Sequence, residues 1–301
     1  MRHRISVIGA DEVGHAVARR LAARDDSELV LCDARPGDAQ VRALDLNHAA
    51  ALSGYEPCLT PSEVYEEIGG SELVVLTGAH LPATAADSPD ERFTENASAL
   101  AQVADEVARH APDAIVLVLA PPADALCEVV LERTRFPRGR VIGIAGSLSG
   151  AALRARLAHQ LRISVRDISV VVLGGPGPRT VPLASHMAAG GIPVAQLLAP
   201  GRLEATLTWM AERRLEPPEA AAAAAAELVE AIVLDQRRLL CCAVQCQGEF
   251  GIDGLVAGVP VKVGKDGVGE ILELALSDSE REALHEACAA SHRLARAFLD
   301  A

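Results

Sequence analysis

The chain has 301 residues, half of them apolar, and a formal net charge of −13. This length and composition indicate a folded protein of about two domains. The acidic balance argues against nucleic acid or an anionic membrane as a partner, because both need a basic surface. No apolar run approaches the roughly 18 residues that cross a membrane, so we expect a cytoplasmic protein.

Short apolar runs alternate with helical patterns through the first half of the chain. The predicted strands are 5–8, 28–33, 72–78, 114–120 and 140–146, and the predicted helices are 13–24, 41–52, 96–110 and 123–133. Continuous apolar runs of this length are typical of strands buried on both faces, and strands that alternate with helices pair in parallel. Residues 1–145 therefore predict an α/β domain, a doubly wound parallel sheet of the Rossmann type.

The second half, residues 146–301, predicts a mixed α+β lobe. Its helical patterns cover 149–161, 201–238 and 277–301, and its predicted strands are 167–175, 181–187, 258–264 and 270–276. An alanine run inside the long helical tract is a strong helix former. We expect Ser277 or Ser279 to cap the last helix. The seven cysteines include the cluster Cys241, Cys242 and Cys246, which lacks zinc-ligand spacing, so we expect small buried side chains and no metal site.

The stretch GADEVG, residues 9–14, joins the first predicted strand to the first predicted helix. Gly9 and Gly14 occupy the first and third places of a dinucleotide-binding turn, and Asp11 replaces the second glycine. Asp33 follows 19 residues after Gly14, where an acid takes the ribose hydroxyls of NAD. A carboxylate about 4 Å from a phosphate charge costs roughly 4 kcal/mol, so we expect Asp11 to weaken phosphate binding. The turn thus predicts no resident cofactor, with weak binding of NAD as the alternative.

The whole chain resembles the malate/lactate dehydrogenase family, and the malate dehydrogenase branch most. The segments that carry this resemblance are ISVIGADEVG, VLCDARPGDAQVRALDL, RVIGIAGSL, GGPGPRTVPL, GGIPV and GVPVKVGKDGVGEILELALS. The resemblance implies a Rossmann domain followed by a catalytic lobe, usually in dimers or tetramers. It also implies hydride transfer to or from a nicotinamide, supported by a histidine, an aspartate that orients it, arginines for the substrate carboxylate, and an asparagine.

The positions of these catalytic side chains carry other residues here. Pro176 stands where the family has its histidine, Ser149 where it has the aspartate, Ala152 where it has the carboxylate-binding arginine, and Pro121 where it has the asparagine. Proline cannot move a proton. The loop at 80–93 is acidic and has no arginine before Arg92, although the family carries two on this loop.

Two histidines could in principle replace the missing proton carrier. His80 opens the altered loop, and His186 lies ten residues after Pro176. We interpret both as surface or packing residues. Asp124, which the resemblance retains, is interpreted as a carboxylate at a helix start.

The residues therefore favour a catalytically inactive homologue with a structural or regulatory role, in a homo-oligomer or as the partner of an active subunit. One alternative is an active NAD-dependent oxidoreductase of the malate dehydrogenase type with a rearranged site. A second is a binding module or enzyme for an uncharged or cationic metabolite, since the cleft has lost its predicted anion-binding arginines.

Overall fold

The computed structural model describes residues 2–24, 26–77, 89–175, 179–212 and 217–301. Within these residues, nine strands form one sheet in the order β14-β13-β12-β6-β5-β4-β1-β2-β3. The six strands at one end pair in parallel. They are β1 (His3–Ile8), β2 (Ser27–Cys32), β3 (Leu59–Ser62), β4 (Leu73–Leu76), β5 (Ile115–Val118) and β6 (Val141–Ile144).

The sheet continues beyond β6 with three antiparallel strands from the second half of the chain. These are β12 (Arg238–Gln247), β13 (Asp253–Gly264) and β14 (Gly267–Ile271). β12 pairs with β6 through Cys242 opposite Ile144. The two halves of the sequence therefore share one continuous sheet, and the apolar clusters on it contain residues of both halves.

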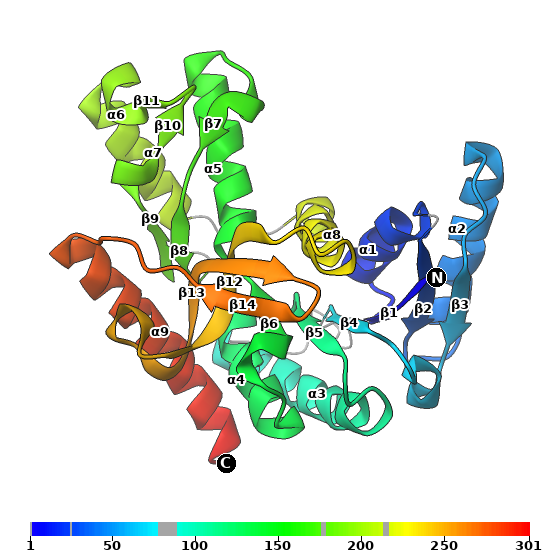
Figure 1. Cartoon of the computed structure of the whole chain (residues 1–301). Helices are drawn as coiled ribbons and strands as arrows, with labels where there is room; N and C mark the ends of the chain where they lie inside the picture. The colour runs from blue at the N-terminus through cyan, green and yellow to red at the C-terminus, as the bar shows by residue number, and fades with distance from the viewer. Residues whose placement is uncertain (1, 25, 78–88, 176–178, 213–216) are drawn as a thin grey trace.

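Helices cover both faces of this sheet (Figure 1). On one face lie α3 (Pro89–His110), α4 (Ala123–Thr134) and α9 (Asp278–Leu299), and on the other lie α1 (Glu12–Ala22), α5 (Gly146–Leu161) and α8 (Pro218–Val233). α2 (Asp38–Ser53) flanks the β3 edge. The strands are apolar on both sides because each side is covered: every residue of β4, β5 and β6 is buried.

A smaller unit rises from the sheet around the far end of α5 (Figure 1). It contains a three-stranded sheet of β7 (Ile168–Ser169), β10 (Ala188–Ala189) and β11 (Ile192–Pro193), with the helices α6 (Val194–Leu197) and α7 (Pro200–Glu212). The hairpin of β8 (Val172–Gly174) and β9 (Thr180–Pro182) links this unit to the main sheet. Short 3₁₀ turns cover Tyr65–Ile68, Arg138–Arg140, Val165–Asp167, Ala184–His186 and Glu249–Gly251.

The predicted fold class is confirmed, and several element predictions need correction. The helical tract predicted at 201–238 is divided into α7 and α8, because Pro217 and Pro218 allow a helix to begin but not to continue. The strand predicted at 167–175 is split between two sheets, and the one predicted at 270–276 ends at Ile271. β3 has no counterpart in the prediction. The boundary between residues 145 and 146 stays a prediction.

Other local predictions agree with the structure. Ser277 caps α9, and its side chain and that of Glu280 form a reciprocal capping box. Cys242 and Cys246 are buried in β12, and Cys241 is half-buried. Among the described helices, none is long and apolar enough to span a membrane.

Candidate functional site

The turn between β1 and α1 has the tight geometry that its glycines predict. Gly9 adopts a φ of 109°, a conformation that glycine adopts without strain. A Cβ on Gly14 would overlap the carbonyl oxygen of Gly9, so helix and strand approach too closely for any other residue. The structure thus confirms the strand–turn–helix arrangement on which a dinucleotide-binding turn is built.

Asp11 caps the N-terminus of α1. Its Oδ1 accepts a hydrogen bond from the backbone N–H of Gly14 at 2.7 Å. The carboxylate therefore occupies a position where free N–H groups and the helix dipole would favour a phosphate. Asp11 has a structural role in this turn, and the same role opposes a bound anion.

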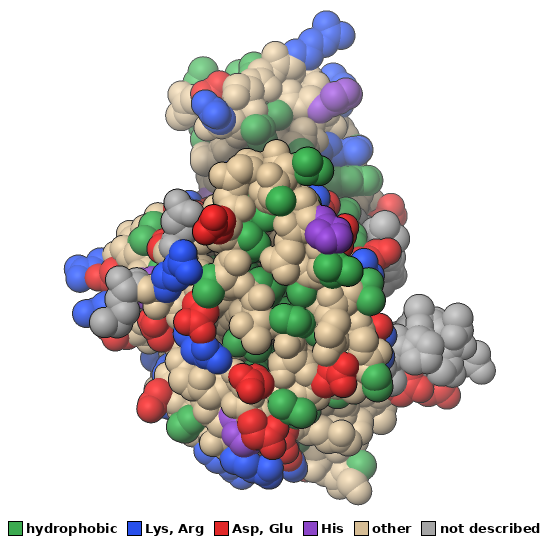
Figure 2. Space-filling model, turned by 90° about the vertical axis from the view of Figure 1, so that its right-hand side faces the viewer, with side chains coloured by type: hydrophobic (Ala, Val, Ile, Leu, Met, Phe, Trp, Pro, Cys, Tyr) green, Lys and Arg blue, Asp and Glu red, His purple; other side chains and the backbone are tan. Residues whose placement is uncertain are grey.

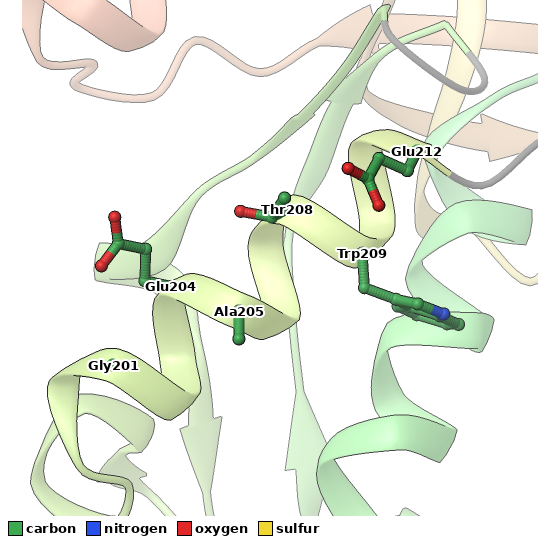
Figure 3. A pocket seen from close by; sticks show the side chains of 6 residues that line it. All are labelled: Gly201, Glu204, Ala205, Thr208, Trp209 and Glu212. Carbon is green, nitrogen blue, oxygen red and sulfur yellow. The ribbon is translucent and has the colours of Figure 1, made fainter.

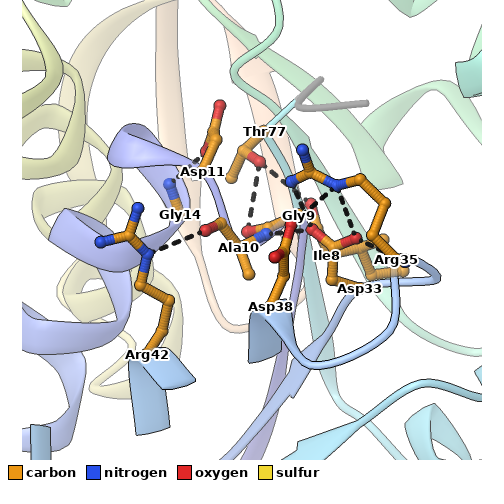
Figure 4. Close-up of polar contacts among 10 residues, drawn as sticks. All are labelled: Ile8, Gly9, Ala10, Asp11, Gly14, Asp33, Arg35, Asp38, Arg42 and Thr77. Carbon is orange, nitrogen blue, oxygen red and sulfur yellow. Dashed lines mark hydrogen bonds and ion pairs between the residues drawn. The ribbon is translucent and has the colours of Figure 1, made fainter. Parts of the chain in front are cut away.

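Asp33 lies at the end of β2 beside this turn, where its spacing predicts it, and is fully buried. Its carboxylate accepts hydrogen bonds from the backbone N–H groups of Ala10 at 2.7 Å and Arg35 at 2.9 Å. The guanidinium of Arg35 covers the same carboxylate, with Nε 3.2 Å from Oδ1 and Nη2 3.1 Å from Oδ2 (Figure 4). Arg35 also pairs with Asp38 at 3.0 Å.

Two further side chains fix the turn from neighbouring elements (Figure 4). Thr77, at the end of β4, donates its hydroxyl to the carbonyl of Ile8 at 3.1 Å. Arg42 of α2 donates Nε to the carbonyl of Ala10 at 3.3 Å. The turn is therefore held by contacts from three sides.

A groove of about 480 Å³ lies at the carboxyl end of β2, alongside α3. Its walls include Ala34, Arg35, Tyr65 and Ala99. Burial, with the nearby Cys32 and Asp33, raises the pKa of Tyr65 to about 12, so its hydroxyl stays neutral. Ligands of open α/β sheets bind at the carboxyl ends of the strands, so the groove suits the adenosine end of a dinucleotide. The turn and the groove fit such a cofactor, and Asp11 opposes its phosphates.

The four positions that the resemblance assigns to catalytic residues lie on other segments than this turn. Pro121 is exposed after β5, and the side chain of Asn96 on α3 donates to its carbonyl at 3.4 Å. Ser149 is buried in the first turn of α5, and Ala152 is half-buried one turn later. Pro176 lies outside the described residues, as do residue 80 and the acidic segment up to residue 88.

His186 does reach a hollow, but away from the dinucleotide-binding turn. It is half-buried and hydrogen-bonds the hydroxyl of Ser185 at 3.0 Å. The hollow measures about 470 Å³, and Ser147 and Arg154 also contribute to its walls. The prediction describes His186 as a packing or surface residue. The structure adds that this residue also lines a hollow.

A buried polar cluster that the sequence analysis did not single out lies beside Gly175, directly before Pro176. Asp124, 3% exposed, accepts a hydrogen bond from the hydroxyl of Ser291 on α9. The guanidinium of Arg179 lies 3.3 Å from the same carboxylate. A Cβ on Gly175 would overlap this carboxylate, so both charged groups touch the turn. Arg179 belongs to the GGPGPRT segment. The sequence could have pointed to this cluster through that cation, three residues after Pro176.

A third hollow, of about 410 Å³, lies over α7 (Figure 3). Glu204, Thr208 and Trp209 line it, and the Trp209 side chain points towards α5, where the guanidinium of Arg156 lies 4.3 Å from its ring centroid. One helix face forms this depression, and Trp209 is already used in packing. We assign it no chemistry.

Comparisons with known proteins place the chain among dehydrogenases. A family model described as the lactate/malate dehydrogenase NAD binding domain matches residues 3–143, and one described as the alpha/beta C-terminal domain of the same family matches residues 219–293. The chain is 38% identical over 306 residues to the malate dehydrogenase of Thermomicrobium roseum, with 99% of each chain covered.

Solved structures agree with this likeness. The malate dehydrogenase of Salinibacter ruber superposes with a TM-score of 0.90 at 33% identity, over 99% of this chain and 97% of the other. The lactate dehydrogenase of Cryptosporidium parvum, solved in complex with lactic acid and nicotinamide adenine dinucleotide, superposes with a TM-score of 0.93 at 27% identity, over 100% and 99%.

The expectation of a catalytically inactive homologue is wrong in the light of these relatives. Proteins 33–38% identical to nearly the whole chain are named malate dehydrogenase. The expectation weighed only the side chains replaced at family positions. It gave no weight to charged groups that other elements bring to the same place, such as Arg179.

Proposed function

The chain belongs to the lactate/malate dehydrogenase family, and from this premise we propose that it is an active oxidoreductase of the malate dehydrogenase type with a rearranged site. Its cofactor is a nicotinamide adenine dinucleotide, and its substrate is a small 2-keto or 2-hydroxy acid. The observation that carries the proposal is the likeness to the Thermomicrobium roseum malate dehydrogenase over 99% of both chains.

The cofactor-binding part of the proposal rests on the turn at residues 9–14 and the groove beside α3. Gly9 and Gly14 would allow the backbone to approach a pyrophosphate, and the residues of the groove would hold the adenosine. A nicotinamide cofactor held there would supply or accept the hydride. Asp11 lowers the affinity for the phosphates, so we expect weak cofactor binding at neutral pH.

The reaction centre needs a cation for the substrate carboxylate and a group that handles the proton. We infer that Pro176, Ser149, Ala152 and Pro121 supply neither, since none of these side chains carries a charge or a basic nitrogen. Arg179 supports the proposal as the replacement cation, because its guanidinium lies at the Gly175 turn with a side chain 19% exposed. A guanidinium can bind a carboxylate through two N–H groups while it still contacts Asp124.

The test is turnover by purified protein with oxaloacetate and either NADH or NADPH. We expect oxidation of the cofactor that falls about tenfold or more in kcat/KM in Arg179→Gln, since one charge-assisted contact is worth roughly that much. The matched control is Arg166→Gln, an exposed arginine on a 3₁₀ turn of the small unit.

A contaminating host dehydrogenase would be unaffected by either substitution, so the variant series separates the two sources of activity. Absence of turnover above the blank with both cofactors at millimolar concentration would refute the proposal. Turnover that is equal in the wild type and Arg179→Gln would remove the assigned role of Arg179.

Two other expectations stay predictions, namely a cytoplasmic location and assembly into oligomers. Exposed apolar side chains on α2 support assembly with a second copy: Val41 is 65% exposed, Leu44 is 56% exposed and Leu52 is 93% exposed. Their spacing puts them on one side of the helix. Figure 2 views the molecule from the side on which α2 lies. Apolar side chains lie along the centre of that face, between charged ones. Light scattering tests the assembly.

A further inference from the structure

The carboxylate of Asp33 is saturated by its own chain. A carboxylate offers about four lone-pair directions to donors. The N–H groups of Ala10 and Arg35 take two of them, and Nε and Nη2 of Arg35 approach the others at 3.2 and 3.1 Å. Asp33 is also fully buried. A ribose hydroxyl therefore finds no acceptor at Asp33 unless the guanidinium moves away.

The group presented to the groove in place of that carboxylate is a cation. The side chain of Arg35 is 47% exposed and forms part of the groove wall. Its neighbours Asp33, Asp38 and Asp11 raise its pKa, chiefly through the hydrogen bond to Asp33, so it is charged at every physiological pH. A guanidinium has five N–H donors, and the contacts to Asp33 and Asp38 use only Nε and Nη2.

A second arginine contacts the same turn, and the α3 wall of the groove carries Asp105, Glu106 and Arg109. Arg42 reaches the carbonyl of Ala10 from the second turn of α2. The N-terminus of this 16-residue helix begins after Gly37, which has no side chain to cap it. Figure 4 shows Arg42 on one side of the turn and Arg35 on the other. Buried Asp33 and the half-exposed Arg35 together carry no net charge, so Asp33 does not repel an anion as a free carboxylate would.

We propose that Arg35 makes the adenosine end of the site selective for a 2′-phosphate, so that the cofactor is NADP(H) rather than NAD(H). This inference rests on the proposed function, because it names the form of the cofactor that the same site takes. Hydroxyl recognition needs a free acceptor, which Asp33 lacks. Phosphate recognition needs charged donors, and Arg35 provides those N–H groups that its contacts to Asp33 and Asp38 leave unused.

The test uses fragments that lack the nicotinamide, so turnover does not decide the result. Both fragments carry the same 5′-phosphate, so repulsion by Asp11 affects them equally and cancels in the comparison. Calorimetry compares adenosine 2′,5′-bisphosphate with adenosine 5′-monophosphate on the full chain. We expect the bisphosphate to bind about tenfold or more tightly, the gain typical of charge-assisted contacts to a phosphate. In Arg35→Ala that preference disappears, because the released Asp33 now accepts the 2′-hydroxyl and repels the 2′-phosphate.

Two further variants keep the test decisive. Arg296→Gln is the matched control, since this arginine of α9 is 48% exposed and pairs with Asp300, and we expect the preference to remain. Arg35→Lys keeps the charge without the fork and should keep part of the preference. Thermal melting of each variant verifies that it is folded.

Equal binding of the two fragments, a preference for the monophosphate, or no binding of either at millimolar concentration would overturn the inference. So would a preference that survives Arg35→Ala. The outcome is separable from the proposed function: turnover with NADH in preference to NADPH refutes the inference alone. Selective fragment binding without any turnover of oxaloacetate refutes the proposed function and leaves the inference standing.

Discussion

Replacement of Asp11 by glycine should convert a weak phosphate site into a strong one at almost no cost in stability. The carboxylate is bonded to the Gly14 N–H at 2.7 Å, so a phosphate at the same helix N-terminus would lie about 4 Å from it. At an effective dielectric constant near 20, that repulsion is about 4 kcal/mol, or roughly a thousandfold in affinity. Loss of the cap to glycine changes helix stability by only a few tenths of a kcal/mol.

The assay is fluorescence titration of NADPH and NADH into the wild type, Asp11→Gly and Asp11→Asn, with urea unfolding of each. Asp11→Asn keeps the Cβ and an oxygen that can cap α1 but removes the charge. Most of the gain should therefore appear already in this variant, and glycine adds the space for close approach of the backbone. If neither variant binds either cofactor more tightly than the wild type, the electrostatic argument about Asp11 is refuted.

Three further predictions concern the turn, the buried cluster and pH. Gly14→Ala should lower the free energy of unfolding by about 2 kcal/mol, because the Cβ overlaps the Gly9 carbonyl and α1 must shift; urea unfolding that matches the wild type would contradict this. Ser291→Ala should lower the free energy of unfolding by about 2 kcal/mol, because it removes a hydrogen-bond donor to the buried Asp124. Calorimetric melting would detect this loss, and an unchanged melting temperature would disprove the contact. Burial, and after it the nearby Arg42, lowers the pKa of His15 below its ordinary value of 6.5. The unfolded chain therefore binds a proton at His15 more readily than the folded chain does. The free energy of unfolding should accordingly fall as the pH drops below about 6.5. In His15→Gln that part of the slope should vanish, and an identical pH profile of unfolding would count against the assignment.

The elements of the parallel sheet could be predicted because their signals are local. Runs such as residues 114–120 are apolar without alternation, and this marks a strand buried on both faces wherever it lies in the chain. The glycines of the first turn are likewise recognised from spacing alone. β3 escaped prediction because Leu59–Ser62 contains a proline and only one aliphatic residue, and it becomes a strand through pairing with β2.

The candidate site could be predicted only in part. The spacing predicts the position of Asp33 at the end of β2. It does not predict that Arg35 covers the carboxylate. The Arg35 side chain, two residues away, points towards Asp33 only because the chain bends after β2. Arg179 was overlooked because its partners lie far along the chain: Asp124 is 55 residues away, and Ser291, on the same carboxylate, is 167 residues from Asp124.

By itself, the sequence determined the alternation of strands and helices, the fold class and the family. Only the tertiary structure decided which carboxylates are covered by cations and which charged groups meet at the Gly175 turn. The physical reason is the distance along the chain over which each effect acts. Periodicity and capping act over a few residues and can be read in the chain, whereas the state of a charged site depends on groups that folding brings together from distant segments.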